Sequence, residues 1–340
     1  MKRSLAFLTL LLVAAGCGGG GEKKSSETTG QGAKEQMRVG LVTDVGGLND
    51  RGFNHLSFVG LQRAEREFGI KQRVFQAEST QEYVPNLSTF ARQGYDLTIG
   101  VGYTEANAID TAATNFPKSN FAIVDVDQTE EPHKPPNLLG LLFREQETGF
   151  LVGYLAGLEE KRRPGPDIIG SVGGQKQPPV DRFIAGYQAG ARTADPGIKT
   201  LNGYSQDFND QAKCKQVALN QIEQGAGVIF QVAGGCGLGA LDAAKEKGVW
   251  GIGVDADQSF LGPHILTSAV KRVDTAVFVA IKRVADGNFK GGNLEFGLKG
   301  NGVGIGKISP KVPKSEVAEV NKVRADIISG RIKNIPTEVK

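Results

Sequence analysis

From residue 37 onward, short apolar runs alternate with longer segments in which apolar side chains recur at helical spacing. Residues 38–44 form the first run, rich in Val and Leu, and predict a buried strand, whereas residues 53–68 have the spacing of a helix. The same alternation continues in the first half of the chain, with strands expected at 74–77, 95–101 and 121–126 and helices at 83–93 and 105–115. Strands that alternate with helices indicate βαβ units and a parallel sheet.

The pattern then restarts after a helix expected at 147–160 and a turn at 163–166. This second series predicts strands at 168–172, 198–204, 228–232 and 249–254 and helices at 180–193, 211–224 and 238–247. A later helix, from 270 to about 285, is expected to return to the first half. Two such series predict an α/β protein with two doubly wound, Rossmann-like lobes, whose strand ends enclose a ligand cleft.

These patterns divide the chain into consecutive parts. We expect a first lobe, a second lobe and a C-terminal helix with its tail, at residues 37–143 plus about 271–310, 144–270 and 311–340 respectively.

The first residues resemble an export signal. Lys2 and Arg3 are followed by an uncharged apolar run that is shorter than the roughly 20 residues of a membrane-spanning helix. The run ends in Ala14, Ala15, Gly16 and Cys17, which resembles a bacterial lipobox, although position 14 more often holds leucine. We therefore predict a signal peptide at 1–16, lipid on Cys17 and a polar, flexible tether at 17–36.

Charge and composition exclude several partners. Loss of Lys2 and Arg3 lowers the formal charge from +3 to +1, and no basic run follows, so nucleic acid is not expected as a partner. The three histidines are scattered without the spacing of metal ligands, so no metal site is expected. Membrane contact is expected through the lipid alone. Cys214 and Cys236 either form a disulfide or remain as two buried thiols.

Candidate ligand-binding residues follow the first predicted strand. Asp44 ends that strand, and Phe53 and Asn54 open the next helix, with Phe53 directed either into the cleft or onto the sheet. Asn49 and Asp50 are equally consistent with a helix cap. Asp127, after the fourth strand, is either a further ligand contact or a solvated turn residue.

The second half repeats the arrangement with Phe208, which stands beside Asp207 and Asn209 just before a helix. Two aromatic rings at equivalent places in two lobes would hold a flat ring between them, or both phenylalanines belong to the core.

A third segment, 232–240, offers a different function. Gly235, Gly237 and Ala240 match the G-x-G-x-x-A dinucleotide fingerprint, and Asp255 lies 20 residues beyond Gly235. A dinucleotide-binding oxidoreductase is therefore an alternative. The late position of the motif in the chain and the export signal argue against it.

Five blocks stand out, at residues 42–50, 149–156, 230–235, 253–258 and 266–274. Together they resemble the basic membrane protein family of substrate-binding lipoproteins, similar to the purine nucleoside receptor A type. The resemblance covers essentially the whole chain from Arg38 to about 310. The resemblance implies a type I periplasmic-binding-protein fold and a receptor, not an enzyme, that needs no cofactor. It delivers a nucleoside, expected to be a purine, to the permease of an ABC importer. A sugar or an autoinducer remains the alternative ligand.

The resemblance also implies roles for individual residues. The base stacks between Phe53 and Phe208, with Asp44 near its edge. Asp255 and Lys271 grip the ribose hydroxyls, and the backbone at Gly234 approaches the sugar. Cys236 departs from the family pattern in this loop. The receptor is expected to be a monomer at the cell membrane that faces the exterior or periplasm and closes about a hinge when it binds its ligand.

Overall fold

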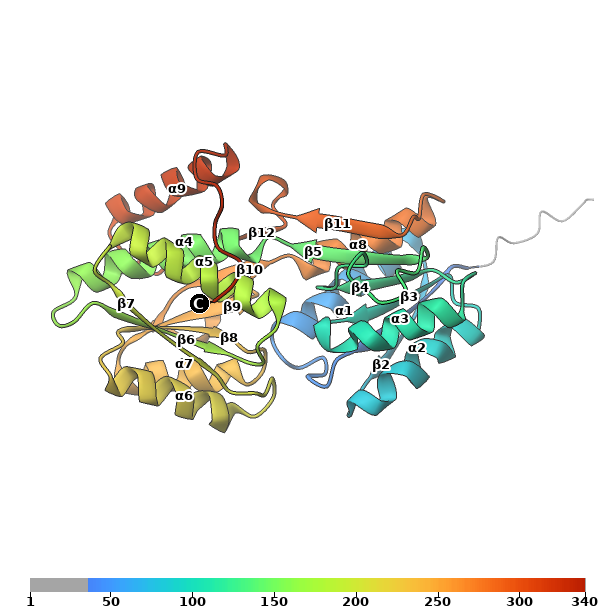
Figure 1. Ribbon diagram of the computed structural model, residues 1–340, viewed down its shortest axis with the longest axis horizontal. Helices are drawn as coiled ribbons and strands as arrows, with labels where there is room; N and C mark the ends of the chain where they lie inside the picture. Colours follow the sequence, from blue (N-terminus) through green and yellow to red (C-terminus); the bar gives the residue numbers. More distant parts are fainter. Residues whose placement is uncertain (1–35, 340) are drawn as a thin grey trace, which may run out of the picture. The chain divides into compact units, whose positions relative to one another are not determined.

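The computed structural model describes residues 36–339. The predicted signal peptide, the lipidation site Cys17 and almost all of the predicted tether lie outside the described residues. Within residues 36–339, two six-stranded sheets form two α/β lobes (Figure 1).

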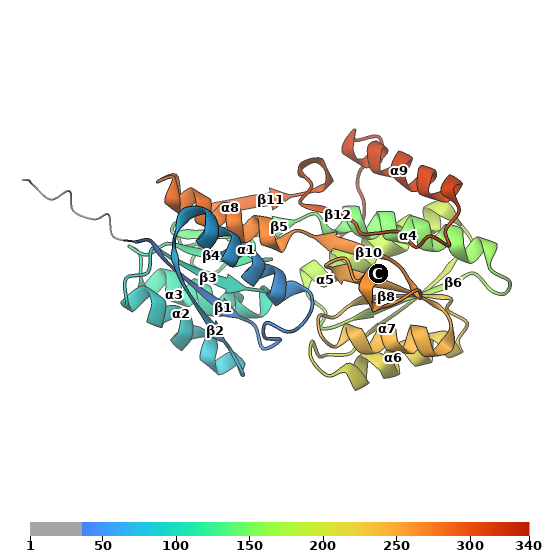
Figure 2. The same cartoon turned by 180° about the vertical axis from the view of Figure 1, so that it is seen from behind.

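The first sheet has the strand order β11-β5-β4-β3-β1-β2, and all of its neighbouring strands are parallel. Its strands are β1 (Arg38–Thr43), β2 (Lys71–Gln76), β3 (Leu97–Val101), β4 (Phe121–Val124), β5 (Leu138–Phe143) and β11 (Gly292–Phe296). Helices cover both faces of this sheet (Figures 1 and 2): α1 (Phe53–Phe68) and α8 (Val273–Ala285) on one, α2 (Tyr83–Arg92) and α3 (Ala106–Asn115) on the other.

The second sheet has the order β12-β10-β9-β8-β6-β7, in which β12 alone runs antiparallel to its neighbour. Its strands are β6 (Ile168–Gly173), β7 (Lys199–Tyr204), β8 (Val228–Val232), β9 (Trp250–Asp255), β10 (Ile265–Lys271) and β12 (Val303–Ile305). One face carries α4 (Glu145–Arg162) and α5 (Pro178–Ala194), the other α6 (Gln211–Glu223) and α7 (Gly237–Lys247), as Figure 1 shows. The last helix, α9 (Lys314–Ile328), packs on α4.

The chain passes between the lobes at three places, from β5 to α4, from β10 to α8 and from β11 to β12. The return of α8 to the first lobe agrees with the expectation from sequence. The prediction that residues up to about 310 belong to the first lobe is wrong for those after 300, because β12 pairs with β10 in the second sheet. The glycine-rich segment before β12 is thus a third crossing between the lobes.

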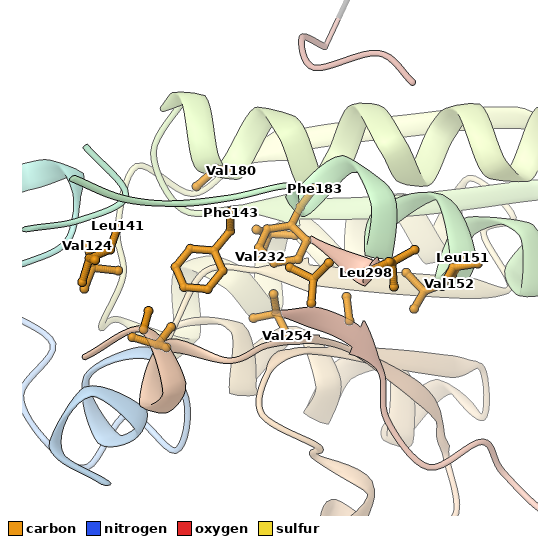
Figure 3. Packing of buried hydrophobic residues seen from close by; sticks show 14 of the residues in the cluster. Val124, Leu141, Phe143, Leu151, Val152, Val180, Phe183, Val232, Val254 and Leu298 are labelled. Atoms are coloured by element: carbon orange, nitrogen blue, oxygen red, sulfur yellow. The ribbon is translucent and has the colours of Figure 1, made fainter. Parts of the chain in front are cut away.

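One hydrophobic cluster runs through both lobes along these crossings. Figure 3 shows Val124 and Leu141 of the first sheet at one end, Val232 and Val254 of the second sheet near the middle, and Phe143 beside Phe183. Because the cluster is continuous, the strand ends that meet at the lobe boundary rest on a packed apolar base.

Candidate functional site

A cleft lies where the carboxyl ends of the parallel strands of the two sheets face each other, and residues of both lobes line it. In each sheet the strand order reverses beside the first strand, between β1 and β3 and between β6 and β8. Loops that leave such a switch point diverge and leave room for a ligand. The loops after β1, β3, β6 and β8 supply Asp44, Gly102, Gln177 and Gly234 to the cleft wall.

The wall of the first lobe is held by a carboxylate and amide network around Asn54. The Asn54 side chain donates to Asp44 Oδ1 at 2.7 Å and to Asp50 Oδ2 at 3.3 Å. Asp50 also accepts the main-chain amides of Asn54 and His55, so it caps the first turn of α1, as the sequence allowed. Among residues 36–339, the buried Asn54 Oδ1 has no hydrogen-bond partner, so it can accept from a ligand donor.

Asp44 accepts the main-chain amide of Gly46 at 2.8 Å in addition to the Asn54 amide. Burial nevertheless raises the pKa of its carboxyl to about 6, because these two hydrogen bonds offset only part of the desolvation. The Phe53 ring, partly buried, lies against Gly102 and faces the cleft instead of the sheet.

The wall of the second lobe is built around Phe208. Its ring lies on Gly174, where a side chain would overlap the ring atoms, and its carbonyl oxygen accepts the amide of Cys236 at 2.8 Å. Gly234 has a φ of 53°, a left-handed conformation that suits glycine, and its backbone passes close to the Phe208 carbonyl. This packing puts the glycine loop and the aromatic ring side by side on one wall.

Lys271, at the end of β10, lies at the base of the cleft and is almost fully buried. Its ammonium group lies 2.7 Å from Asp125 Oδ2, across the lobe boundary, and 2.9 Å from Glu145 Oε1. Arg182 also pairs with the Glu145 carboxylate, since its Nε donates to Glu145 Oε2 at 2.6 Å. Burial lowers the pKa of Lys271, but Asp125, Glu145 and Asp255 outweigh that effect, so its pKa is raised. The ammonium group therefore remains charged without solvent.

Asp255 ends β9 with a φ of 63° and is 6% exposed. Burial raises the pKa of its carboxyl to about 7; nearby Lys271 lowers it, and the Asp125 carboxylate raises it further. A carboxylate that is desolvated but lines an open cleft is suited to accept hydrogen bonds from ligand hydroxyls.

The structure brings most of the sequence-predicted ligand residues to this cleft: Asp44, Phe53, Asn54, Phe208, Gly234, Asp255 and Lys271 all line it. Asp127 does not. Its carboxylate accepts from Thr129 and Asn293, so it stabilises a turn on the outer side of β5 and β11, as its alternative interpretation proposed. Asp125, two residues earlier, faces the cleft in its place.

The sequence analysis also missed Asp125, Gln177, Val180 and Phe183 as lining residues. Asp125 directly follows β4 and has a φ of 72°, which is similar in position and conformation to Asp255, the last residue of β9, with a φ of 63°. The match between Val124-Asp125 and Val254-Asp255 was the signal available in the sequence. The start of α5, with Gln177 and Val180, carried no comparable signal.

Cys214 and Cys236 form a disulfide, which resolves the alternatives that the sequence left open. Two positions of the fingerprint-like motif have a packing explanation: a side chain at Gly237 would overlap Gln231, and Ala240 is fully buried. At these two positions the small residues are explained by the packing of α7.

The chemistry of the cleft is that of a hydrogen-bond acceptor surface. Four carboxylates line it, from Asp44, Asp50, Asp125 and Asp255, against the single ammonium group of Lys271. The lining residues within 36–339 include no Cys, His or Ser that would serve as a nucleophile or general base. Such a surface is suited to ligands that are rich in hydrogen-bond donors and disfavours anions.

Comparison with known proteins agrees with this arrangement. The solute-binding protein of an ABC transporter system from Aeropyrum pernix superposes with a TM-score of 0.80 at 28% identity, over 88% of this chain and 94% of that one. The two-lobed fold and its cleft define a substrate-binding protein of an ABC transporter. The family model described as "ABC transporter substrate-binding protein PnrA-like" matches residues 37–337, and the chain belongs to this family.

Two relatives extend the comparison. The "ABC transporter nucleoside-binding protein BmpA" of Lactococcus lactis is 34% identical over 331 residues, which cover 90% of this chain and 91% of that protein. An "Uncharacterized lipoprotein" of Pyrococcus horikoshii is 36% identical over 317 residues, or 89% of this chain and 77% of that protein. The periplasmic-binding-protein fold and the family resemblance predicted from sequence are thus confirmed. Within residues 36–339, no helix combines the length and apolar character needed to cross a bilayer.

Proposed function

We propose that this protein captures a nucleoside, expected to be a purine nucleoside, in the cleft and presents it to the permease of an ABC importer. The observation that carries the proposal is the placement of Phe53 and Phe208 on opposite lobes of the cleft that Asp255 and Lys271 also line. The name of the Lactococcus relative, a nucleoside-binding protein, supports the same ligand class.

The residues divide the ligand into two parts. The two phenylalanine rings offer apolar faces to a flat base, which stacks on such rings regardless of its substituents. In this proposal, Asp255 accepts hydrogen bonds from the vicinal ribose hydroxyls, and Lys271 balances the charge of Asp255. Asp44 and the free Asn54 Oδ1 supply further acceptors on the first lobe.

Transport follows from closure of the two lobes on the ligand. Contacts from both lobes stabilise the closed form, which the permease then recognises. The receptor acts as a monomer, held at the outer side of the membrane by lipid on Cys17, in agreement with the lipoprotein name of the Pyrococcus relative. The lipid raises the receptor's effective concentration at the permease.

Calorimetric titration tests the proposal. The purified protein is unfolded and refolded without reductant to remove bound ligand, and is then titrated with guanosine, adenosine, inosine, cytidine and ribose. We expect saturable one-to-one binding of at least one purine nucleoside and weaker or no binding of ribose. Binding of ribose or another sugar without any nucleoside would support the alternative ligand class and overturn the role of the two rings.

A further inference from the structure

The Cys214–Cys236 disulfide lies directly behind the loop that carries Phe208. Cys214 is in the first turn of α6, and Cys236 immediately precedes α7. Both cysteines are fully buried, with their Cα atoms 5.6 Å apart. The bond thus joins the beginnings of two helices, and each helix is preceded by a loop that lines the cleft.

The Phe208 loop, residues 205–210, is hydrogen-bonded to the rest of the lobe at two places, and the Phe208 ring also packs on Gly174. At its start, the amides of Ser205 and Gln206 donate to Gly173 and Gly174 at 2.9 Å each, which extends the pairing of β7 with β6. At Phe208 itself, the carbonyl oxygen accepts the Cys236 amide at 2.8 Å. The second attachment holds only if Cys236 stays in place.

Bonds within the loop fix its local shape but not its position. Asp207 accepts the amides of Asn209 and Asp210 and pairs with Lys213 at 2.7 Å. These partners all belong to the loop or to α6, so they would move together with it. The disulfide and the bond between Cys236 and Phe208 connect this unit to the glycine loop at 233–236.

We propose that the disulfide is a positioning element of the binding site: it fixes Phe208 and the loop of Gly234 relative to each other before ligand arrives. An unconstrained loop must be ordered when the ligand binds, and that ordering opposes binding. A loop that is already fixed gives a tighter and slower-dissociating complex. The inference rests on the proposed function, because it assigns Phe208 to ligand contact.

The competing view is that the disulfide only stabilises the fold. The packing of α6 on α7 provides the matched control, because it is maintained by buried small residues that include Ala218, Ala240 and Ala243. Ala243 lies on α7, away from the cleft lining. Ala243→Gly is expected to weaken the same helix pair while the disulfide and the hydrogen bond between Cys236 and Phe208 stay in place.

The experiment compares the wild type with the double variant C214A/C236A and with A243G. Guanosine affinity is expected to fall about tenfold in the double variant, the effect of losing preorganisation at one or two ordered side chains, and to change less than about twofold in A243G. Affinity losses that merely follow the loss in melting temperature for both variants would overturn the proposal.

Amide hydrogen exchange of the ligand-free protein gives a readout that needs no nucleoside. Residues 205–210 and 233–237 should exchange at least about tenfold faster in C214A/C236A, and at the wild-type rate in A243G. Unchanged exchange in these loops would overturn the proposal even if nucleosides bind. Faster exchange with no nucleoside binding in the wild type would sustain the positioning role and overturn the proposed function alone.

A second route covers the case in which the double variant does not fold. A phosphine reduces the disulfide of the folded wild-type protein to two thiols and is itself converted to the phosphine oxide, with water supplying the oxygen and the protons. The rate of amide hydrogen exchange in the two loops is compared between the oxidised and the reduced protein. The proposal expects faster exchange in these loops after reduction, and equal rates would contradict it.

Discussion

The side-chain amide of Asn209, in the second lobe, donates a hydrogen bond of 3.0 Å to the carbonyl oxygen of Val45, in the first lobe. This bond spans the cleft beside Phe208 and Asp44. It can form only when the two lobes are close, so it contributes to the stability of the closed form and not to that of the open form.

Asn209→Ala should therefore weaken ligand binding without unfolding the protein. A neutral hydrogen bond contributes about 0.5–1.5 kcal/mol, which corresponds to a roughly 2- to 10-fold loss of affinity through faster dissociation. Stopped-flow measurement of ligand dissociation checks this expectation. Asn220→Ala, on the exposed side of α6, is the control and should dissociate at the wild-type rate.

Gly174→Ala should displace the Phe208 ring, because the added Cβ would overlap three of its atoms. We expect the affinity for guanosine to fall as far as it does in Phe208→Ala, by roughly 1–3 kcal/mol, the contribution of one stacked base. Titration calorimetry measures it. Gly197→Ala, where the nearest atom is 3.7 Å away, should bind normally, and a normal affinity for Gly174→Ala would show that the ring does not need this position.

Lys271→Met should destabilise the protein by about 3–5 kcal/mol, because Asp125 and Glu145 lose a buried counter-charge. Adding Asp125→Asn should restore much of that loss, since Glu145 keeps its pair with Arg182. Urea denaturation gives both values. Lys282→Met breaks an exposed pair with Asp286 and should cost less than about 1 kcal/mol. No recovery in the double variant would mean that Lys271 acts through packing and not through charge.

Asp255→Asn should stabilise the ligand-free protein at neutral and higher pH. The pKa of Asp255 is raised from 3.8 to about 7, so ionisation favours the unfolded chain as the pH rises from 4 to 7. The asparagine variant does not ionise, so it avoids this loss of folding stability, which amounts to at most about 4 kcal/mol. Asparagine also tolerates the left-handed backbone at this position.

Thermal denaturation in the absence of ligand shows whether Asp255→Asn raises or lowers the stability of the protein. The variant should gain melting temperature at about pH 8 and lose that advantage near pH 4, where Asp255 is neutral in both states. Asp242→Asn is a control of opposite sign, because Lys215 lowers the pKa of Asp242 and its carboxylate stabilises the fold. A variant of Asp255 that is less stable than the wild type at high pH would contradict the desolvation of this carboxyl.

The alternation of apolar runs and helical periodicity predicted the two lobes, but four strands escaped it. In β10 the buried Thr267 and Ser268 interrupt the apolar run, and in β11 exposed residues alternate with partly buried ones in a glycine-rich setting. β5 is buried almost throughout and leads directly into α4, so its periodicity merges with that of the helix. β12 has only three residues, and tertiary pairing with β10 defines it.

Cleft-lining residues were predicted where the residue type and the strand end coincide, as at Asp44 and Asp255, and in the loop before a helix, as at Phe208. The prediction failed where two similar side chains follow one strand and only one of them lines the cleft. Asp125 and Asp127 both follow β4, and only the turn conformation, with a φ of 72° at Asp125, decides which of them faces the cleft. The start of α5 was missed because its approach to the cleft depends on how α5 packs on α4, which local sequence does not encode.

The most direct test of the account is the guanosine affinity of Phe208→Ala compared with that of Phe260→Ala. Both substitutions remove the same ring, but Phe208 lines the cleft whereas Phe260 is 62% exposed and does not. The account predicts that Phe208→Ala loses about 1–3 kcal/mol of binding free energy and that Phe260→Ala binds like the wild type. Equal affinities for the two variants and the wild type would contradict a base held between the lobes.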